Sequence, residues 1–205
     1  MAKFLVTSMN FNMHLDVQED EMISCYGELL VLPLDECEEE DNSFCVGTLR
    51  ATIIPWHCNE TMAMYAEERD VFDVWELLGG KNFEEKSCGY DGHFEATGDV
   101  LLITKLRVKP EFRGFNLGLN LLYESCRHFG RGCAGAIMLP CPLDEDDVKK
   151  REIGRKKLQQ YYRQLGFKRF KRSNYFSFDF ACDMDKPKIN SEICIDCESQ
   201  RSSKQ

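Results

Sequence analysis

Two glycines and an arginine follow an apolar segment near the middle of this 205-residue chain. Val100–Val108 is rich in branched aliphatic residues, which predicts a strand, and Pro110 ends it because proline cannot donate to a sheet ladder. Arg113, Gly114 and Gly118 follow, and a helix is expected to begin near Gly114. The first N–H groups of a helix lack intrahelical acceptors and lie at the positive end of its dipole. Beside glycines without a Cβ, they predict a site for a phosphate-like anion.

Two common phosphate-binding patterns are missing from this stretch. Residues 100–118 carry neither the GxGxxG dinucleotide fingerprint nor the GxxxxGK[ST] P-loop. Both folds that carry these motifs are therefore disfavoured.

A second segment with chemistry-bearing residues, 158–167, ends a predicted helix. Four apolar or aromatic residues share one helix face: Leu158, Tyr161, Tyr162 and Leu165. Gly166 suits the left-handed position after a helix, and Phe167 can pack back on the last turn. Tyr162 can pack against the sheet, and Tyr161 is expected in the core.

Both segments resemble motifs of one family. The stretch Val108-Lys-Pro-Glu-Phe-Arg-Gly-Phe-Asn-Leu-Gly118 looks like motif A of the GCN5-related N-acetyltransferase (GNAT) superfamily, and 158–167 (LQQYYRQLGF) looks like its motif B. The resemblance spans about residues 24–180. It implies an α/β (α+β) fold, a central mixed, mostly antiparallel, splayed sheet flanked by helices. It also implies an N-acetyltransferase that uses acetyl-CoA as co-substrate.

The resemblance assigns roles to individual residues. Backbone amides of the loop would hold the pyrophosphate of coenzyme A: Arg113, Gly114, Phe115, Asn116, Leu117 and Gly118. The strand edge at Leu106, Arg107 and Val108 would pair with the pantetheine arm as an added strand. Tyr162 would protonate the departing thiolate. Asn116 replaces the central glycine of the family loop; asparagine tolerates unusual backbone angles, but its side chain would crowd the phosphate path.

The implied reaction is direct transfer of an acetyl group to a primary amine of an unidentified acceptor. A non-catalytic acyl-CoA-binding or regulatory domain on the same fold is the alternative. The general base stays open among Glu76, Glu95, Asp99, His57 and His93. The three carboxylates are otherwise expected to be solvated, and neither histidine has a local partner in the sequence. A covalent route through the thiol of Cys126 or Cys141 is less favoured, because the family usually transfers directly and His128 points to another helix face than Cys126.

The elements that must position these residues can be read from hydrophobic periodicity. Residues 24–34 and 43–55 are predicted as antiparallel strands, and 61–78 as a helix with Met64 on its apolar face. A Gly- and charge-rich loop at 81–98 completes an insertion over about 59–98, while residues 4–20 are ambiguous. The second half alternates between strands and helices, which indicates helices packed on a sheet: strand 100–108, helix 114–129, strand 134–139, helix 144–165, strands 167–170 and 175–182.

These elements predict a single domain over residues 1–182. From residue 183 the sequence is polar and aperiodic, which predicts a disordered tail over 183–205.

Composition narrows the classes of partner. A net charge of −9 disfavours nucleic acid. The acidic run 35–41 is expected to be a solvated loop, or else a field that attracts a cationic amine. No run of 18 apolar residues and no secretory signal is present, so neither membrane insertion nor export is expected, and the cytoplasm is the expected compartment. The oligomeric state stays open.

Eleven cysteines, an odd number, fit free thiols in a reducing compartment. Four of them lie singly inside apolar runs, where a thiol packs like a small hydrophobic group: Cys45, Cys126, Cys133 and Cys182. Cys194 and Cys197 form the single CxxC pair, and zinc usually needs two such pairs. No metal is therefore expected.

Overall fold

The computed structural model describes residues 2–15, 22–34, 43–58, 60–65, 70–78, 98–142, 147–170, 173–188 and 192–195. Its strands are β1 (Ala2–Leu15), β2 (Ile23–Pro33), β3 (Phe44–Ile54), β4 (Asp99–Val108), β5 (Cys133–Met138), β6 (Lys168–Arg169), β7 (Phe176–Asp179) and β8 (Glu192–Ile195). Its α-helices are α1 (Glu60–Tyr65), α2 (Asp70–Leu78), α4 (Leu117–Phe129) and α5 (Val148–Tyr162). Short 3-10 helices η2 (Pro110–Phe112) and η3 (Arg163–Leu165) flank the last two.

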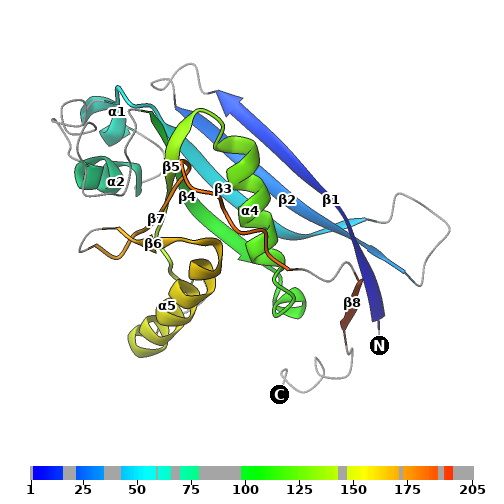
Figure 1. Cartoon of the computed structure of the whole chain (residues 1–205). Helices are drawn as coiled ribbons and strands as arrows, with labels where there is room; N and C mark the ends of the chain where they lie inside the picture. Colours follow the sequence, from blue (N-terminus) through cyan, green and yellow to red (C-terminus); the bar gives the residue numbers. More distant parts are fainter. Residues whose placement is uncertain are drawn as a thin grey trace.

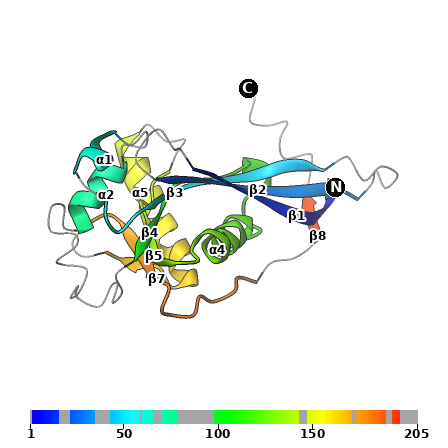
Figure 2. The ribbon, with the colours of Figure 1, turned by 90° about the horizontal axis from the view of Figure 1, so that it is seen from above.

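The described strands form one open sheet in the order β6-β7-β5-β4-β3-β2-β1-β8 (Figure 1). Neighbouring strands run antiparallel except β4 and β5, which are parallel because α4 crosses over between them. Helix α4 lies across strands β1 to β4, as Figure 2 shows from above. This mixed, mostly antiparallel sheet with flanking helices confirms the fold class expected from the sequence.

The sheet separates two hydrophobic cores. Strand β4 shows the division, because Leu101 and Ile103 face one core while Val100 and Leu102 face the other. The first core contains α4, Tyr162 at the end of α5, and Leu165 of η3. The second core contains α1 and α2. Burial on both faces explains why β4 reads in the sequence as a continuous apolar run.

The sheet opens between its two parallel strands. Pairing of β4 with β5 ends at Ile103 and Met138, whereas β4 continues to Val108. Within the described residues, 104–108 therefore have no strand beside them on the β5 side. On its other side β4 carries an irregularity, because Arg50 pairs with Lys105 but Ala51 pairs with Ile103, which leaves Thr104 as an extra residue. Bulges of this kind are common next to active sites.

Strand β1 occupies most of the stretch that is ambiguous in the sequence. Phe4 and Val6 pack on the core, and so do Met9 and Phe11. An irregularity in pairing with β2 between Val6 and Ser8 shifts the alternation by one residue. This shift removes the strict period of two that the sequence pattern requires.

Two further differences concern helices and the chain end. The expected helix over 61–78 is two helices, α1 and α2, and Met64 is 62% exposed rather than on the apolar face; Met62 and Ala63 are buried instead. Within the predicted tail, Glu192–Ile195 form β8 on the edge of β1, with Ile193 fully buried. An apolar side chain that fits the first core explains this order. The expected loop at 35–41, residues 81–97 of the expected loop at 81–98, and Cys197 lie outside the described residues.

The described helices include none with the length and hydropathy needed to span a membrane.

Candidate active site

A groove of about 670 Å³ follows the open edge of β4 and the start of α4. Its walls come from β4, η2, the loop before α4, the segment after β5, and α5. Fifteen of the described residues line it: Leu106, Arg107, Val108, Phe112, Arg113, Gly114, Leu117, Gly118, Cys141, Pro142, Gly154, Lys157, Leu158, Tyr161 and Tyr162. None of these fifteen is acidic, and three are cationic. The groove therefore suits an elongated anionic ligand with apolar parts.

The loop before α4 has the backbone that close approach to an anion requires. Gly114 has φ +91°, and a Cβ there would meet nothing within 4 Å. Glycine is therefore required at this position by the left-handed backbone and not by close packing. A Cβ on Gly118 would lie 3.4 Å from Tyr161 Oη and 3.5 Å from Val108 Cγ2. Arg113 Nε donates to the carbonyl of Val108 at 3.0 Å, which ties the loop to the end of β4.

Asn116 adopts the left-handed conformation, with φ 59° and ψ 16°, directly before α4. The turn therefore survives without the family's central glycine. The side chain points elsewhere than expected, because Nδ2 donates to the carbonyl of Lys188 at 3.3 Å. Neither Asn116 nor Phe115, which packs on the first core, lines the groove.

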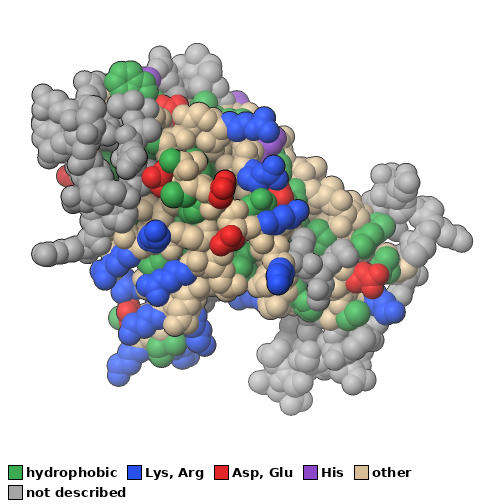
Figure 3. All heavy atoms as spheres, viewed as in Figure 1, with side chains coloured by type: hydrophobic (Ala, Val, Ile, Leu, Met, Phe, Trp, Pro, Cys, Tyr) green, Lys and Arg blue, Asp and Glu red, His purple; other side chains and the backbone are tan. Residues whose placement is uncertain are grey.

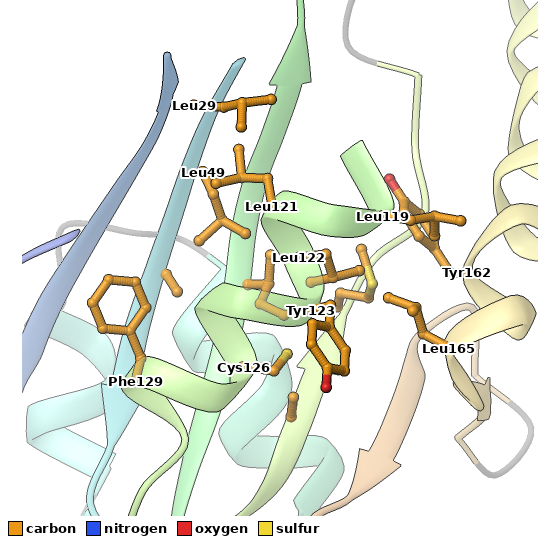
Figure 4. Close-up of a cluster of buried hydrophobic side chains, with 14 of the residues drawn as sticks. Leu29, Leu49, Leu119, Leu121, Leu122, Tyr123, Cys126, Phe129, Tyr162 and Leu165 are labelled. Atoms are coloured by element: carbon orange, nitrogen blue, oxygen red, sulfur yellow. The ribbon is translucent and has the colours of Figure 1, made fainter. Parts of the chain in front are cut away.

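Two tyrosines at the end of α5 close the groove. The backbone N–H of Leu119, in the first turn of α4, donates to Tyr161 Oη at 3.2 Å. Tyr161 is thus half-buried at the helix start instead of simply being a core residue. Tyr162 is 5% exposed, and burial raises its pKa well above the ordinary value. Figure 4 shows Tyr162 reaching from α5 toward Leu119 on α4.

A smaller side cavity of about 270 Å³ lies where the sheet opens. Its polar lining comes from four separate parts of the chain, namely α2, β4, the segment after β5, and α5: Asp70, Thr104, Lys105, Cys141, Arg151 and Tyr162. Tyr162 also lines the groove, as do Leu106, Cys141 and Pro142. Tyr162 therefore stands at the junction of a cationic groove and a polar cavity.

Local structure fixes the helix that carries Tyr162. Asp147 caps α5, because its carboxylate accepts from the N–H groups of Lys149 and Lys150 at 2.9 and 3.0 Å. Gly154 permits close packing, since a Cβ there would lie 2.5 Å from Pro142 Cγ. Gly166, with φ +89°, ends the last turn as the sequence predicts.

Sequence reasoning identified one half of this arrangement. Leu106, Arg107, Val108, Arg113, Gly114, Leu117, Gly118 and Tyr162 meet in the groove. The sequence analysis did not single out Lys157 of α5, which also lines the groove. Its position next to Leu158 in the second motif is the signal that could have identified it. Sequence reasoning also missed Asp70, Lys105 and Arg151, which no local pattern connects.

The base candidates from the sequence lie elsewhere. Asp99 Oδ1 accepts from the backbone N–H of Trp56 at 3.1 Å, and Glu76 and His57 are exposed at positions that line neither cavity. Glu95 and His93 lie outside the described residues. Asp70 is the carboxylate in the side cavity.

The cysteines divide by location. Cys126 is buried on α4, and burial raises its pKa, which keeps the thiol protonated and unreactive. Cys45 and Cys133 are half-buried, but Cys182 is exposed, so its expected packing role is wrong. Cys141 faces both cavities, and Arg151 Nε donates to its Sγ at 3.2 Å. Among the described residues no group of three His, Cys, Asp or Glu side chains could hold a metal ion.

Comparison with known proteins gives structural similarities alone. No family model matches the sequence, and no curated protein matches it. Among solved structures, a tyrosine-to-phenylalanine mutant of KacT is similar at 14% identity and a TM-score of 0.46, covering 85% of this chain and 96% of that one. NAA60 of Arabidopsis thaliana in complex with acetyl-CoA is similar at 12% identity and a TM-score of 0.42, covering 85% of this chain and 100% of that one.

A third similar structure is a GNAT family acetyltransferase from Brucella melitensis in complex with acetyl-CoA, at 16% identity and a TM-score of 0.33. The alignment covers 78% of this chain and 64% of that one. At such low sequence identity, the similarity is one of fold, and it does not extend to activity.

Proposed function

We propose that this chain is an acetyl-CoA-dependent N-acetyltransferase that moves the acetyl group directly to a primary amine. The observation that carries the proposal is the position of Tyr162 between the cationic groove and the polar side cavity. Such a junction lets two reactants meet at one proton donor. Holding them together in the reacting geometry is itself a large part of catalysis.

The parts of acetyl-CoA would lie in order along the groove. The N–H groups of Leu117 and Gly118 lie in the first turn of α4, where helix geometry leaves them without intrahelical acceptors, so they would hold the pyrophosphate with Arg113 and Gly114 nearby. The open edge of β4 at Leu106, Arg107 and Val108 would pair with the amides of the pantetheine arm. Lys157 would add positive charge from α5.

As the amine nitrogen bonds to the acetyl carbon and the C–S bond breaks, Tyr162 would supply the proton for the departing thiolate. The proton that the nitrogen loses would pass to solvent, from which the phenolate is reprotonated. When bound, acetyl-CoA supplies the activated acetyl group. The phenol stays protonated through neutral pH because burial raises its pKa. An amine entering the side cavity must be neutral to attack, so we expect the rate to rise as the amine loses its proton.

Binding is tested by calorimetry with acetyl-CoA on two neighbouring lysine variants. Lys157→Gln removes a cation that lines the groove, and we expect affinity to fall by up to about fivefold, the scale of one exposed ion pair. Lys156→Gln removes the adjacent cation, which lines neither cavity, and should leave affinity unchanged. Absence of binding by the folded wild-type protein would end the proposal.

Turnover separates an enzyme from a non-catalytic acyl-CoA-binding domain. We expect a panel of primary amines to accelerate release of free thiol from acetyl-CoA. Binding without acceleration by any amine would favour the binding domain.

The direct route has its own test at Cys141. Cys141→Ser should retain turnover, and the wild-type protein incubated with acetyl-CoA alone should show no acetyl group on Cys141 by mass spectrometry. An acetylated Cys141 together with loss of activity in the serine variant would instead indicate a covalent route through this thiol.

A further inference from the structure

Among the described residues, one negative and two positive side chains line the side cavity. Asp70 comes from the first turn of α2, Lys105 from the end of β4, and Arg151 from the first turn of α5. The remaining lining is largely apolar, including Ile103, Met138 and Leu139. Charges of both signs therefore face a space of about 270 Å³ beside Tyr162.

Arg151 is held at this cavity by its contact with Cys141. Its Nε donates to Cys141 Sγ at 3.2 Å, and the capped first turn of α5 fixes the backbone beneath it. A guanidinium carries five N–H donors in a fixed fork and pairs well with carboxylate or phosphate. Lys and Arg side chains also gather over α5 in Figure 3, although the chain has a net charge of −9.

Asp70 supplies the opposite charge from another part of the chain. It lies in the insertion that covers the second core, and its carboxylate is close enough to Tyr175 to contribute to the raised pKa of that phenol, after burial. A carboxylate in this position attracts an ammonium group. The polar walls thus favour a ligand that is cationic at one end and anionic at the other.

We propose that the acceptor is a small amine that also carries a carboxylate or phosphate group. This inference rests on the proposed function of the same site. Asp70 attracts the ammonium group, while Arg151 and Lys105 bind the anion. The nitrogen is thereby directed toward Tyr162 and the thioester, which it attacks after it has lost a proton to solvent. Amines without the anionic group enter the cavity but are held less well.

Matched pairs of acceptors test the anion requirement. At saturating acetyl-CoA, the rate of thiol release is measured with O-phosphoethanolamine against ethanolamine, and with β-alanine against propylamine. We expect KM for the anionic member of each pair to be at least about tenfold lower, equivalent to about 1.4 kcal/mol. Equal KM values within both pairs would overturn the inference while the proposed function stands.

Variants assign the anion to Arg151. Arg151→Gln should raise KM for O-phosphoethanolamine about tenfold and leave KM for ethanolamine and affinity for acetyl-CoA unchanged. Lys156→Gln, on the same helix but lining neither cavity, is the matched control and should change neither KM. Asp70→Asn should raise KM for both members of a pair, because both carry the ammonium group. An equal effect of Arg151→Gln on both members would contradict the assignment.

A further comparison with peptide substrates distinguishes a small-molecule acceptor from a polypeptide acceptor. A hexapeptide with an acidic second residue is compared with the same peptide carrying glutamine there. A lower KM for the acidic peptide than for O-phosphoethanolamine and β-alanine would overturn the small acceptor in favour of a polypeptide N-terminus.

If no amine is acetylated, a binding measurement tests whether Arg151 recognises the anionic group. Ligand-observed NMR of O-phosphoethanolamine and ethanolamine then compares wild type with Arg151→Gln. Preferential binding of the phosphorylated amine that is lost in the variant supports the charge assignment even though acetyl transfer fails. Equal binding of the two probes overturns it.

Discussion

Tyr162 combines deep burial with access to two cavities, which is an unusual situation for a phenol. Burial disfavours the phenolate and raises the pKa, so the group remains a proton donor across the range in which enzymes work. A group with a raised pKa holds its proton below that pKa and loses it only as the pH passes above it. Tyr162 should therefore impose no fall in rate between pH 7 and about pH 10.

Replacing this residue tests its role. Tyr162→Phe should lower kcat about 100-fold, the usual contribution of a positioned acid, with affinity for acetyl-CoA unchanged. Steady-state kinetics and calorimetry measure the two quantities. Tyr175→Phe is the matched control, because Tyr175 is also shielded and lines neither cavity. Retention of full kcat in Tyr162→Phe would remove Tyr162 from the mechanism.

Asn116 tests the backbone of the loop. Its φ of 59° costs an ordinary L-residue about 1–2 kcal/mol, and asparagine less. Asn116→Ala should therefore lower the free energy of unfolding by about 1 kcal/mol, measured with urea, whereas Asn116→Gly should be nearly neutral. Equal stability of the two variants would show that the left-handed turn does not govern this position.

At the scale of elements, local patterns predicted the strands and helices that bury one consistent face. β2, β3, β4 and α4 all appear near their expected bounds. Hydrophobic periodicity did not predict the elements whose formation depends on tertiary contacts. The irregularity between Val6 and Ser8 hides the period of β1, and four residues of β8 are ordered by the edge of a strand far away in the sequence.

The order of β8 makes a further element testable. Ile193 is fully buried, so Ile193→Ala should lower the free energy of unfolding by about 2–4 kcal/mol. Ile153, 56% exposed on α5, provides the control, and Ile153→Ala should change it by less than about 0.5 kcal/mol. Urea denaturation measures both. Similar small effects would mean that β8 contributes little to the fold.

At the scale of the molecule, the sequence predicted one half of the candidate site. The segments 106–118 and 158–167 each carry their chemistry within a short stretch, so a motif reveals them. Asp70, Lys105 and Arg151 come together through the packing of α2, β4 and α5. No spacing in a single sequence encodes that meeting, because it depends on how an insertion and a helix settle on the open end of a sheet.

Buried thiols should make the stability of the whole fold depend on alkaline pH. Burial raises the pKa of Cys25 from 9.0 to about 12. Burial, aided by Asp99 and Cys25, also raises that of Cys133 to about 12. The unfolded chain releases these protons first, so the stabilisation is complete below pH 9 and is lost as the pH rises toward 12.

The expected slope is about 1.4 kcal/mol per pH unit for the buried thiol of Cys25 once the unfolded thiol has ionised, and it is smaller for the half-buried Cys133 because solvent screens that thiol. Urea denaturation at pH 8, 9, 10 and 11 measures it. Cys25→Ala should show a shallower fall than Cys182→Ala, whose replaced thiol is exposed. Identical pH profiles in the two variants would contradict a buried, protonated Cys25.

The pairing of β1 has a consequence for how the chain folds. One edge of β1 pairs with β2, which follows it in the sequence. Its other edge pairs with β8, which lies at the opposite end of the described chain. Closing so long a loop carries a large entropic cost before any contact offsets it. Pairing of β8 with β1 should therefore form late during folding. It should also be the first strand pairing to open during local unfolding of the native state.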